Sequence, residues 1–385
     1  MYARSSSRVK LRHEFSRIVI EAIQRARARL EAATPHTGIS LSRVQDGVES
    51  MSMNVRDVAR EAGVSVGTVS NVLNRPEIVS PATVERVLAV IERLGFVRND
   101  AARQLRAGRS HTVGLIVLDT RNPFFTDLAH GAQNQALGEG YTVLLGGSDE
   151  SSERESSLLD LFEEQRVAGV LISPVRTDLS RLWRLRESGT PVVLVDRGSS
   201  DRSFSSVSVD DVEGGRVATQ HLIDIGRRRI AFIGGPLDIE QVAHRLEGAQ
   251  AVVSQCADAV LTVHPTEALT VLEGRRVAEQ LAALPPEQRP DAVFAANDLL
   301  AMGVIQALVM TSSLRVPEDV ALVGYDDIDF ASAAVVPITS VRQPSVEIGK
   351  TALDLLLREA AGAEQREQIV FQPELIARDS TIGRR

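Results

Sequence analysis

Residues 54–74 read NVRDVAREAGVSVGTVSNVLN, and this stretch decides how the N-terminal part of the chain folds. Residues 55–62 are predicted to form a helix, because apolar side chains recur there at the i, i+3, i+4, i+7 spacing of one buried face. Gly63 should end that helix, since glycine adopts the left-handed conformation at little cost. Ser65 is a natural N-cap for a second helix over residues 66–73. Two short helices joined by a tight turn can place a helix N-terminus in the major groove of DNA.

A third helix and a short fourth one are predicted after this pair. Ser80 and Pro81 read as an N-cap followed by proline at the first helical position, and Gly95 is the expected end of the third helix. Asn99 should cap the fourth helix, over residues 100–107. The side chains expected to form the apolar faces of helices two and three are Val69, Val72, Leu73, Val84, Val87, Leu88, Ile91 and Leu94.

From residue 113 the chain alternates short apolar runs with amphipathic segments, the pattern of a parallel sheet with crossover helices. The first predicted strands are residues 113–118, 141–145, 169–172, 192–195 and 207–209. The pattern then restarts with residues 230–233, 259–263, 292–295 and 320–323, and it ends with a strand at 369–376. The sequence therefore predicts an α/β body made of two similar halves.

Composition limits the class of protein. The 385 residues suffice for two or three domains, and the net charge of −8 is unevenly spread. Residues 1–52 carry nine basic and five acidic side chains, residues 53–112 nine and six, and the remainder 25 and 40. A basic head on an acidic body indicates that only the head meets a polyanion, although chance composition would give the same numbers. No apolar run could span a membrane, no secretory signal is visible and Cys256 is the single cysteine, so a cytoplasmic location is expected.

Residues 1–52 differ in character from the remainder of the chain. A basic stretch that could be helical precedes a segment containing proline, glycine and serine, and Met51 and Met53 lie just before the helix-turn-helix. One hypothesis is that translation starts at one of these methionines, so that residues 1–52 are an incorrectly predicted extension. The alternative is a basic arm that adds non-specific affinity for DNA. The intact mass of the native protein distinguishes the two.

Further short motifs follow the helix-turn-helix in a fixed order. They are Asn122-Pro123-Phe124-Phe125, Asp210 through Gly215, Asn297-Asp298, Gly324-Tyr325-Asp326-Asp327 and Arg342-Gln343-Pro344. Together with residues 54–74, they resemble the lactose-repressor (LacI/GalR) family of bacterial transcription regulators across residues 53–381. Residues 1–52 have no counterpart in that family.

The resemblance implies an α/β fold with an N-terminal all-α headpiece. The expected parts are a helix-turn-helix DNA-binding domain at 53–98, a hinge helix and linker at 99–112, and a ligand-binding and dimerisation core at 113–385. The core should have parallel sheets and two subdomains like those of a periplasmic binding protein. Subdomain 1 would comprise about 113–210 and 341–358, and subdomain 2 about 211–340 and 359–385.

The resemblance also assigns the DNA-reading residues. Val66, Gly67 and Asn71 would occupy the base-reading positions of a helix in the major groove. Asn71 can hydrogen-bond bidentately to adenine, which is worth about 1–3 kcal/mol of discrimination, and Val66 can contact a thymine methyl group. Gly67 stands where a polar residue is often found, so direct readout there should be modest. Phosphate contacts suit Ser65, Thr68, Ser70 and Asn74. For Thr68 and Ser70 the alternative is that they only cap or solvate the helix.

Residues 99–109 resemble the hinge helix of the family. An isolated helix this short is marginal in water, so it should order only on DNA, paired with its twin in a dimer. Leu105 would wedge into a central base step of the minor groove, and Arg103 and Arg106 would lie along that groove. The alternative is that Leu105 packs on the third helix. A two-fold dimer implies a pseudo-palindromic operator of double-stranded DNA.

The doubled body resembles a sugar-binding protein that holds its ligand between the halves, near the carboxyl ends of the strands. The residues that the resemblance implies are Phe124, Phe125, Asp149, Arg197, Arg245, Asp298, Asp326 and Gln343. The aromatic rings would form an apolar wall, and the charged groups would bridge hydroxyls. The alternative for Phe125 is core packing, for Arg197 an ion pair with Asp196, and for Asp326 and Gln343 a structural role.

The nature of the effector is only partly constrained. Ile239 and Leu269 stand where purine-sensing relatives place a polar or basic contact and an aromatic ring, so a sugar or polyol is expected instead of a purine. No cofactor and no metal are expected. Ligand should change the angle between the halves and thereby order or melt the hinge helices, but whether it induces or corepresses stays open.

Other classes of protein fit less well. The chain has no G-x-S-x-G, no P-loop and no G-x-G-x-x-G after a strand, which disfavours an enzyme. The attached helix-turn-helix disfavours a transport-associated binding protein. A regulator controlled by a partner protein is the remaining alternative, and it would bind DNA without responding to any small molecule.

Overall fold

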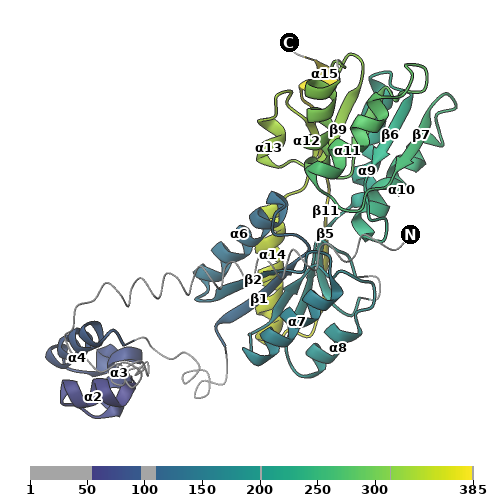
Figure 1. The fold of residues 1–385 in the computed structure, drawn as a ribbon. Coiled ribbons are helices and arrows are strands. Elements are labelled where there is room, and N and C mark those ends of the chain that lie inside the picture. The colour runs from purple at the N-terminus through teal and green to yellow at the C-terminus, as the bar shows by residue number, and fades with distance from the viewer. Residues whose placement is uncertain (1–53, 97–109, 200–201, 313, 384–385) are drawn as a thin grey trace, which may run out of the picture. The chain divides into compact units, whose positions relative to one another are not determined.

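The computed structural model of the chain describes residues 54–96, 110–199, 202–312 and 314–383. They belong to two compact units, one helical and one α/β, which meet in sequence near residue 102 (Figure 1). The predicted hinge helix, with Arg103, Leu105 and Arg106, and the extension 1–52 lie outside the described residues. No helix in the described part of the chain is long and apolar enough to cross a membrane.

The helical unit contains α2 (Val55–Ala62), α3 (Val66–Asn74), a 3₁₀ turn η2 (Pro76–Ile78) and α4 (Pro81–Leu94). Asn54 caps α2 through a capping box with Asp57. Gly63 and Gly95 end α2 and α4 with φ of 64° and 59°, the left-handed conformation predicted for both. The predicted spans of these helices are therefore confirmed, with α3 one residue longer.

The core of the helical unit differs from the prediction at one point. Val69, Val72 and Val87 are buried as expected, together with Val90, which the expected face omits. Leu88 is exposed, so its assignment to the apolar face was wrong. Position 90 follows 87 by three residues and continues the same helical face, whereas position 88 lies about 100° away from 87.

The α/β unit contains two six-stranded sheets. In spatial order, the first consists of β11 (Gln368–Phe371), β5 (Ser205–Val209), β4 (Val192–Val195), β3 (Val170–Ile172), β1 (Thr112–Val117) and β2 (Thr142–Gly147). The second consists of β12 (Glu374–Ile376), β10 (Thr339–Arg342), β9 (Ala321–Asp326), β8 (Ala292–Ala295), β6 (Arg229–Ile233) and β7 (Val260–His264). Every pairing is parallel except that of β10 with β12.

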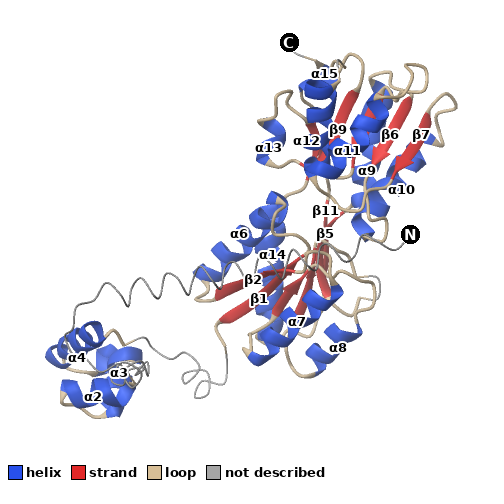
Figure 2. Ribbon diagram, in the orientation of Figure 1, coloured by secondary structure: helices blue, strands red, loops and turns tan. Residues whose placement is uncertain are grey.

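Helices cover both faces of each sheet (Figure 2). Around the first sheet lie α6 (Pro123–Gly138), α7 (Ser152–Glu164), α8 (Ser180–Glu187) and α14 (Ser345–Ala360). Around the second lie α9 (Asp211–Asp224), α10 (Glu240–Val253), α11 (Val271–Ala282), α12 (Asp298–Gln306), the π-helical segment η3 (Ala307–Thr311), α13 (Asp329–Ser332) and α15 (Asp379–Ile382). In β1 the side chains alternate between the faces: Leu115 and Val117 join the core under α6, whereas Ile116 packs with α7 and α8.

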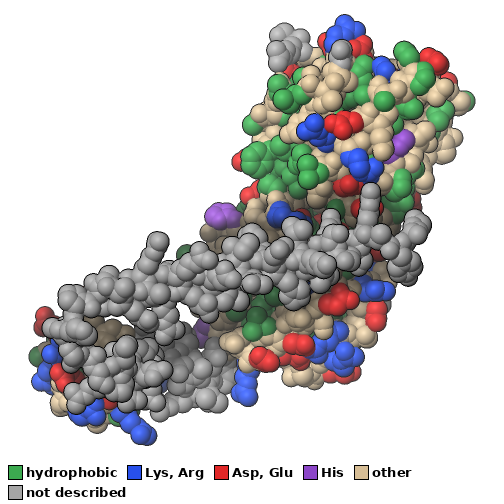
Figure 3. Space-filling view, in the orientation of Figure 1, with side chains coloured by type: hydrophobic (Ala, Val, Ile, Leu, Met, Phe, Trp, Pro, Cys, Tyr) green, Lys and Arg blue, Asp and Glu red, His purple; other side chains and the backbone are tan. Residues whose placement is uncertain are grey.

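The surface over α7 and α8 carries charges of both signs side by side (Figure 3). Arg181 of α8 forms ion pairs with Asp160 and Glu163 of α7. These pairs are partly solvated and contribute little to stability.

The predicted final strand at 369–376 proved to be two strands in different sheets. β11 pairs with β5 of the first sheet, and β12 pairs with β10, a strand that the sequence pattern did not reveal. The first subdomain therefore continues to about residue 371, beyond the expected end at 358. Gln372 and Pro373 separate the two apolar parts of residues 369–376, but the sequence carries no information on which sheet edge each part joins.

Candidate functional site

In the helical unit, α3 presents small and polar side chains to solvent. Gly67 and Asn71 are exposed, and Val66 is half-buried at the helix start. Ser65 Oγ accepts a hydrogen bond from the Thr68 amide at 3.0 Å, which leaves the first turn of α3 at the surface and capped. A helix N-terminus of this kind can enter a DNA groove.

The hydroxyl and amide groups beside this surface are partly engaged within the helix. Thr68 Oγ1 lies 2.9 Å from Ser65 Oγ, so the Thr68 hydroxyl is engaged with the side chain that caps the helix. Asn74 Nδ2 donates to the Ser70 carbonyl at 2.8 Å and to the Ser70 hydroxyl at 3.2 Å. Contact of these groups with phosphates stays a prediction.

In the α/β unit, a cavity lies between the two halves. From the first half it is lined by Leu118, Asp119, Asn122, Phe124, Phe125, Glu150 and Asp196. From the second half it is lined by Ile239, Gln241, Val242, Arg245, Leu269, Asn297, Asp326 and Gln343. Most of these residues directly follow a strand or begin the next helix, so the cavity lies at the carboxyl ends of both sheets, where open α/β folds bind ligands.

Arg245 is the cation of this cavity. Its Nε donates to Asp211 at 2.8 Å, its Nη1 donates to the Ala296 carbonyl at 2.7 Å, and its guanidinium lies 3.7 Å from the centre of the Tyr325 ring. Burial alone lowers the pKa of Arg245, but the negative groups around it, above all Asp211, more than offset this and raise it. Arg245 is therefore charged and fixed in place.

The packing of α9 on α10 brings Asp211 and Arg245 together. A Cβ on Gly215 would lie 2.0 Å from the Arg245 carbonyl oxygen, and a Cβ on Gly248 would lie 2.0 Å from the Val212 carbonyl oxygen. Reciprocal glycines thus let the two helix backbones approach more closely than any other residue would allow.

Asp326 connects the two halves at the base of the cavity. Its carboxylate accepts from Asn122 Nδ2 of the first half at 3.0 Å and from Gln343 Nε2 at 2.8 Å. Burial raises the pKa of Asp326, although Arg245 and both amide donors oppose that rise. Oε1 of Gln343 is buried and has no hydrogen-bond partner among the described residues, so it can accept from a ligand hydroxyl.

A second connection joins the end of β4 to the start of α10. Gln241 Nε2 donates to the carbonyl and the carboxylate of Asp196, at 2.7 and 2.8 Å. Arg197 Nη2 forms an ion pair with Glu240 at 2.5 Å, and Nη1 donates to the Arg176 carbonyl at 2.7 Å. Burial raises the pKa of Asp196 well above its usual range, and the charge of Asp211 adds to this effect.

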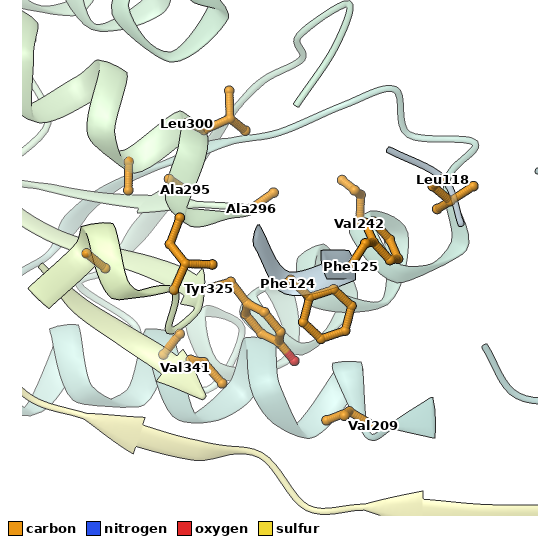
Figure 4. Close-up of a cluster of buried hydrophobic side chains, with 14 of the residues drawn as sticks. Leu118, Phe124, Phe125, Val209, Val242, Ala295, Ala296, Leu300, Tyr325 and Val341 are labelled. Carbon is orange, nitrogen blue, oxygen red and sulfur yellow. The ribbon is translucent and has the colours of Figure 1, made fainter. Parts of the chain in front are cut away.

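Two aromatic side chains contribute to the apolar lining of the cavity, and Figure 4 shows them within the buried hydrophobic cluster. Phe124 and Phe125 pack edge to face with ring centres 5.0 Å apart, and in the close-up Phe124 lies beside Tyr325 and Phe125 beside Val242. The Asn122 side chain accepts from the Phe124 amide and begins α6, which fixes both rings at the helix start. Both rings line the cavity while belonging to the core, so the packing alternative given for Phe125 is met as well.

Comparison with known proteins identifies the family. Residues 54–99 match the model described as bacterial regulatory proteins, lacI family, and residues 219–381 match a periplasmic binding protein-like domain. The chain is 33% identical to the HTH-type transcriptional repressor PurR of Aliivibrio fischeri, over 86% of this chain and 98% of that protein. The chain belongs to the LacI family. It is a DNA-binding transcription regulator.

Solved structures of LacI-family regulators agree with this assignment. The transcriptional regulator CelR in complex with cellobiose is 34% identical, with a TM-score of 0.63 over 85% of this chain and 99% of that one. The lac repressor dimer bound to operator and the anti-inducer ONPF is 25% identical, with a TM-score of 0.73 over 86% and 99%. The predicted fold class is confirmed: helix-turn-helix, then a two-subdomain core with parallel sheets.

Five of the eight predicted cleft residues of this LacI-family chain line the cavity: Phe124, Phe125, Arg245, Asp326 and Gln343. Asp149, Arg197 and Asp298 do not line it. Asp149 pairs with Arg154 on the solvent side. Arg197 pairs with Glu240 and not with Asp196, the partner given in its alternative.

Asp298 is fully buried behind the cavity wall. Its carboxylate accepts from the Ser340 hydroxyl at 2.7 Å and from the Ile328 amide at 3.0 Å, which ties the start of α12 to β10. These bonds occupy both carboxylate oxygens, so a direct ligand contact by Asp298 does not follow from its place in the fold.

A neighbour of each of these three residues lines the cavity instead. Glu150 does so beside Asp149, Asp196 beside Arg197, and Asn297 beside Asp298. These pairs lie in turns or at a helix start just past a strand, where the backbone is no longer extended, so the alternation of the strand does not indicate which of two neighbours faces the cavity. Gln241 and Asp119 were also missed. The sequence feature that could have indicated them is a polar residue in a mostly apolar stretch: Asp119 lies just after a strand, and Gln241 lies at the start of a helix.

Proposed function

We propose that this chain is a homodimeric transcriptional repressor whose affinity for a pseudo-palindromic operator is controlled by a sugar bound in the cavity. The observation that carries the proposal is the cavity itself, at the carboxyl ends of two parallel sheets, with apolar rings on one side and convergent hydrogen-bonding groups on the other. The resemblance over almost its full length to a regulator solved with cellobiose supports a sugar as effector.

The DNA-binding part of the proposal rests on the surface of α3. Val66, Gly67 and Asn71 would read bases, while Ser65, Thr68, Ser70 and Asn74 would contact phosphates. Arg103, Leu105 and Arg106 would act in the minor groove through the hinge helix. The two-fold symmetry of such an operator requires two copies of α3, and the related lac repressor was solved as a dimer on its operator.

The sensing part rests on the residues that the cavity brings together. Phe124 and Phe125 would cover the apolar face of a sugar ring, and Arg245, Asp326 and Gln343 would hold its hydroxyls. Asn297, Asp196 and Gln241 would join them. Ile239 and Leu269 also line the cavity, and neither can hydrogen-bond or stack with a purine as a polar or aromatic side chain would. Similarity to PurR keeps a purine corepressor as the second candidate.

We also propose that the chain binds without turning over its ligand and that it works in the bacterial cytoplasm. Its relative in Aliivibrio fischeri is named a transcriptional repressor, and a regulator of bacterial genes must reach the chromosome. Any hydrolysis of a bound sugar would contradict the first part.

A thermal-shift panel of sugars, polyols and nucleobases on the full chain tests the proposal. A ligand at 100 times its Kd stabilises the native state by about 2.7 kcal/mol, which should raise the Tm by several degrees. Repeating operator binding with the sugar that stabilises the chain would reveal its sign: weaker binding means an inducer, tighter binding a corepressor. A nucleobase as the sole ligand would favour the purine alternative, and operator binding with no ligand at all would favour a partner protein.

A further inference from the structure

Acidic side chains outnumber basic ones around the cavity. Of the described residues that line it, four carry carboxyl groups and one carries a guanidinium. The carboxyl groups belong to Asp119, Glu150, Asp196 and Asp326, and the guanidinium to Arg245. Because Arg245 already forms a buried ion pair with Asp211 at 2.8 Å, its charge is compensated from behind the cavity wall.

The other arginines near the cavity also form ion pairs with carboxylates of the protein. Arg121 forms an ion pair with Asp119 at 2.8 Å, and its side chain extends mostly into solvent. Arg197 is paired with Glu240. Each of these cations serves a carboxylate of the protein, so none brings an uncompensated positive charge to a ligand.

Three helices begin at the cavity, and a helix N-terminus ordinarily attracts anions because its first N–H groups lack partners. Here two of the three starts are capped by a side-chain acceptor, and the third, that of α10, has no side-chain cap but begins with an acidic residue. Asn122 accepts from the Phe124 amide at the start of α6, and Asn297 accepts from the Leu300 amide at the start of α12. The first residue of α10 is Glu240.

Two carboxyl groups that line the cavity have a raised pKa, the direction expected in a site that disfavours anions. Burial is the main reason that the pKa of Glu150 is raised, and the charges of Asp119 and Asp238 add to it. For Asp196 the charges of Asp211 and Asp326 likewise add to the effect of burial on its pKa. An anionic ligand would meet the same two costs, first the loss of solvation and then the proximity of other carboxyl groups.

We infer that the cavity selects an uncharged polyhydroxylated effector and rejects sugar phosphates and sugar acids, an inference that rests on the proposed function of the cavity as the effector site. Neutral hydroxyls can donate to the carboxylates and to Gln343 Oε1 while adding no charge. A phosphate dianion would need several free donors, and the geometry offers it mainly carboxylates.

Titration calorimetry of the full chain with matched sets of ligands tests the inference. Suitable sets are D-ribose with ribose 5-phosphate, D-glucose with glucose 6-phosphate and glucuronate, and cellobiose with cellobionate. In any set that binds, the neutral sugar should bind at least about tenfold more tightly than its charged partners. A phosphate or acid that binds as tightly as its neutral counterpart would overturn the inference while leaving a small-molecule effector in place.

A pair of variants separates charge from bulk. Glu150→Gln removes one lining charge, and Glu153→Gln removes the same charge from the exposed first turn of α7. The affinity for the charged member of a binding set should rise roughly threefold to tenfold in Glu150→Gln and stay unchanged in Glu153→Gln. Equal effects of the two variants would mean that rejection is steric, which contradicts the inference.

Binding of orthophosphate to the full chain, measured by ³¹P NMR, tests the inference even if no sugar binds. No saturable binding to the wild-type cavity is expected. Saturable binding that Arg245→Gln abolishes, with the circular dichroism spectrum retained, would overturn the inference, and Gln343→Leu replaces that variant if Arg245→Gln does not fold. If no sugar in the panel binds, the proposed function is contradicted. The orthophosphate result then decides by itself whether the cavity rejects anions.

Discussion

Gln241 and Asp196 join the two halves of the α/β unit through one side-chain amide. Gln241 Nε2, at the start of α10, donates to both the carbonyl and the carboxylate of Asp196, at the end of β4. Both residues are buried and line the cavity, so this contact links the arrangement of the halves to the place where a ligand would bind.

Gln241→Ala should therefore weaken the α/β unit. Two buried acceptors would lose their donor, which costs about 1–3 kcal/mol. Urea unfolding of the full chain measures the loss. Gln250→Ala, an exposed position on the same helix, is the matched control and should change the free energy of unfolding by less than about 0.5 kcal/mol. Equal losses would mean that the contact with Asp196 contributes nothing.

Arg245→Gln should be more damaging, because it leaves the buried charges of Asp211 and Asp326 without their cation. Breaking a buried ion pair on one side typically costs about 3–5 kcal/mol. The double variant Arg245→Gln/Asp211→Asn should recover much of this loss, as measured by urea unfolding. A double variant no more stable than the single one would show that Arg245 acts through packing on Tyr325.

Two glycines of the helix-turn-helix should respond to alanine in opposite directions. Gly63 has a φ of 64°, and a methyl group added there would meet no atom within 4 Å, so Gly63→Ala should cost about 1 kcal/mol through backbone strain alone. Gly67 lies inside α3, where the added Cβ would be 3.5 Å from Ser65 Oγ, an ordinary contact, so Gly67→Ala should stabilise by about 0.5–1 kcal/mol. Hydrogen exchange of the α2 and α3 amides in the full chain measures the change in stability for each variant. If both variants stabilise the unit, or both destabilise it, the geometry assigned to these glycines is contradicted.

Asn71→Ala should reduce operator discrimination. Loss of a bidentate contact to adenine costs about 1–3 kcal/mol for the specific site, whereas non-specific DNA binding depends on phosphates and should not change. Fluorescence anisotropy with operator and scrambled DNA at one salt concentration measures the difference. Glu85→Gln, on α4, is the control for a polar change off the reading helix. An equal loss of affinity for operator and scrambled DNA would show that Asn71 does not read a base.

The stability of the unit should depend on pH in opposite ways at Glu150 and Glu153. Burial raises the pKa of Glu150, so its ionisation costs stability as pH rises through the raised pKa, and Glu150→Gln should raise the Tm at neutral pH but not in acid. Hydrogen bonds from its own backbone amide and the Ser151 hydroxyl lower the pKa of Glu153. That stability is present above the unfolded pKa and lost as pH falls, so Glu153→Gln should lower the Tm at neutral pH only. Melting curves between about pH 4 and pH 7.5 distinguish the two, and matching profiles would contradict both assignments.

Local chemistry determined the helices of the N-terminal unit. Asn54, Gly63, Ser65 and Gly95 act through their own backbone neighbourhoods, so caps and helix ends could be read from consecutive residues. The alternation of apolar runs with amphipathic segments likewise determined two parallel α/β halves, because a strand buried on both faces needs a continuous apolar run wherever it lies in the sheet.

Only the tertiary structure decided which side chains meet in the cavity. The sequence marks the ends of the strands, but whether Asp298 or Asn297 lines the cavity depends on how the chain leaves β8 and enters α12 against the neighbouring strand β10. The same holds for the division of residues 368–376 between two sheets, since partners such as Ser206 and Arg342 lie far away in the chain. Several strand pairings are compatible with the local sequence at nearly equal energy. Contacts between residues far apart in the chain select one of them, and the spacing of residues does not indicate which.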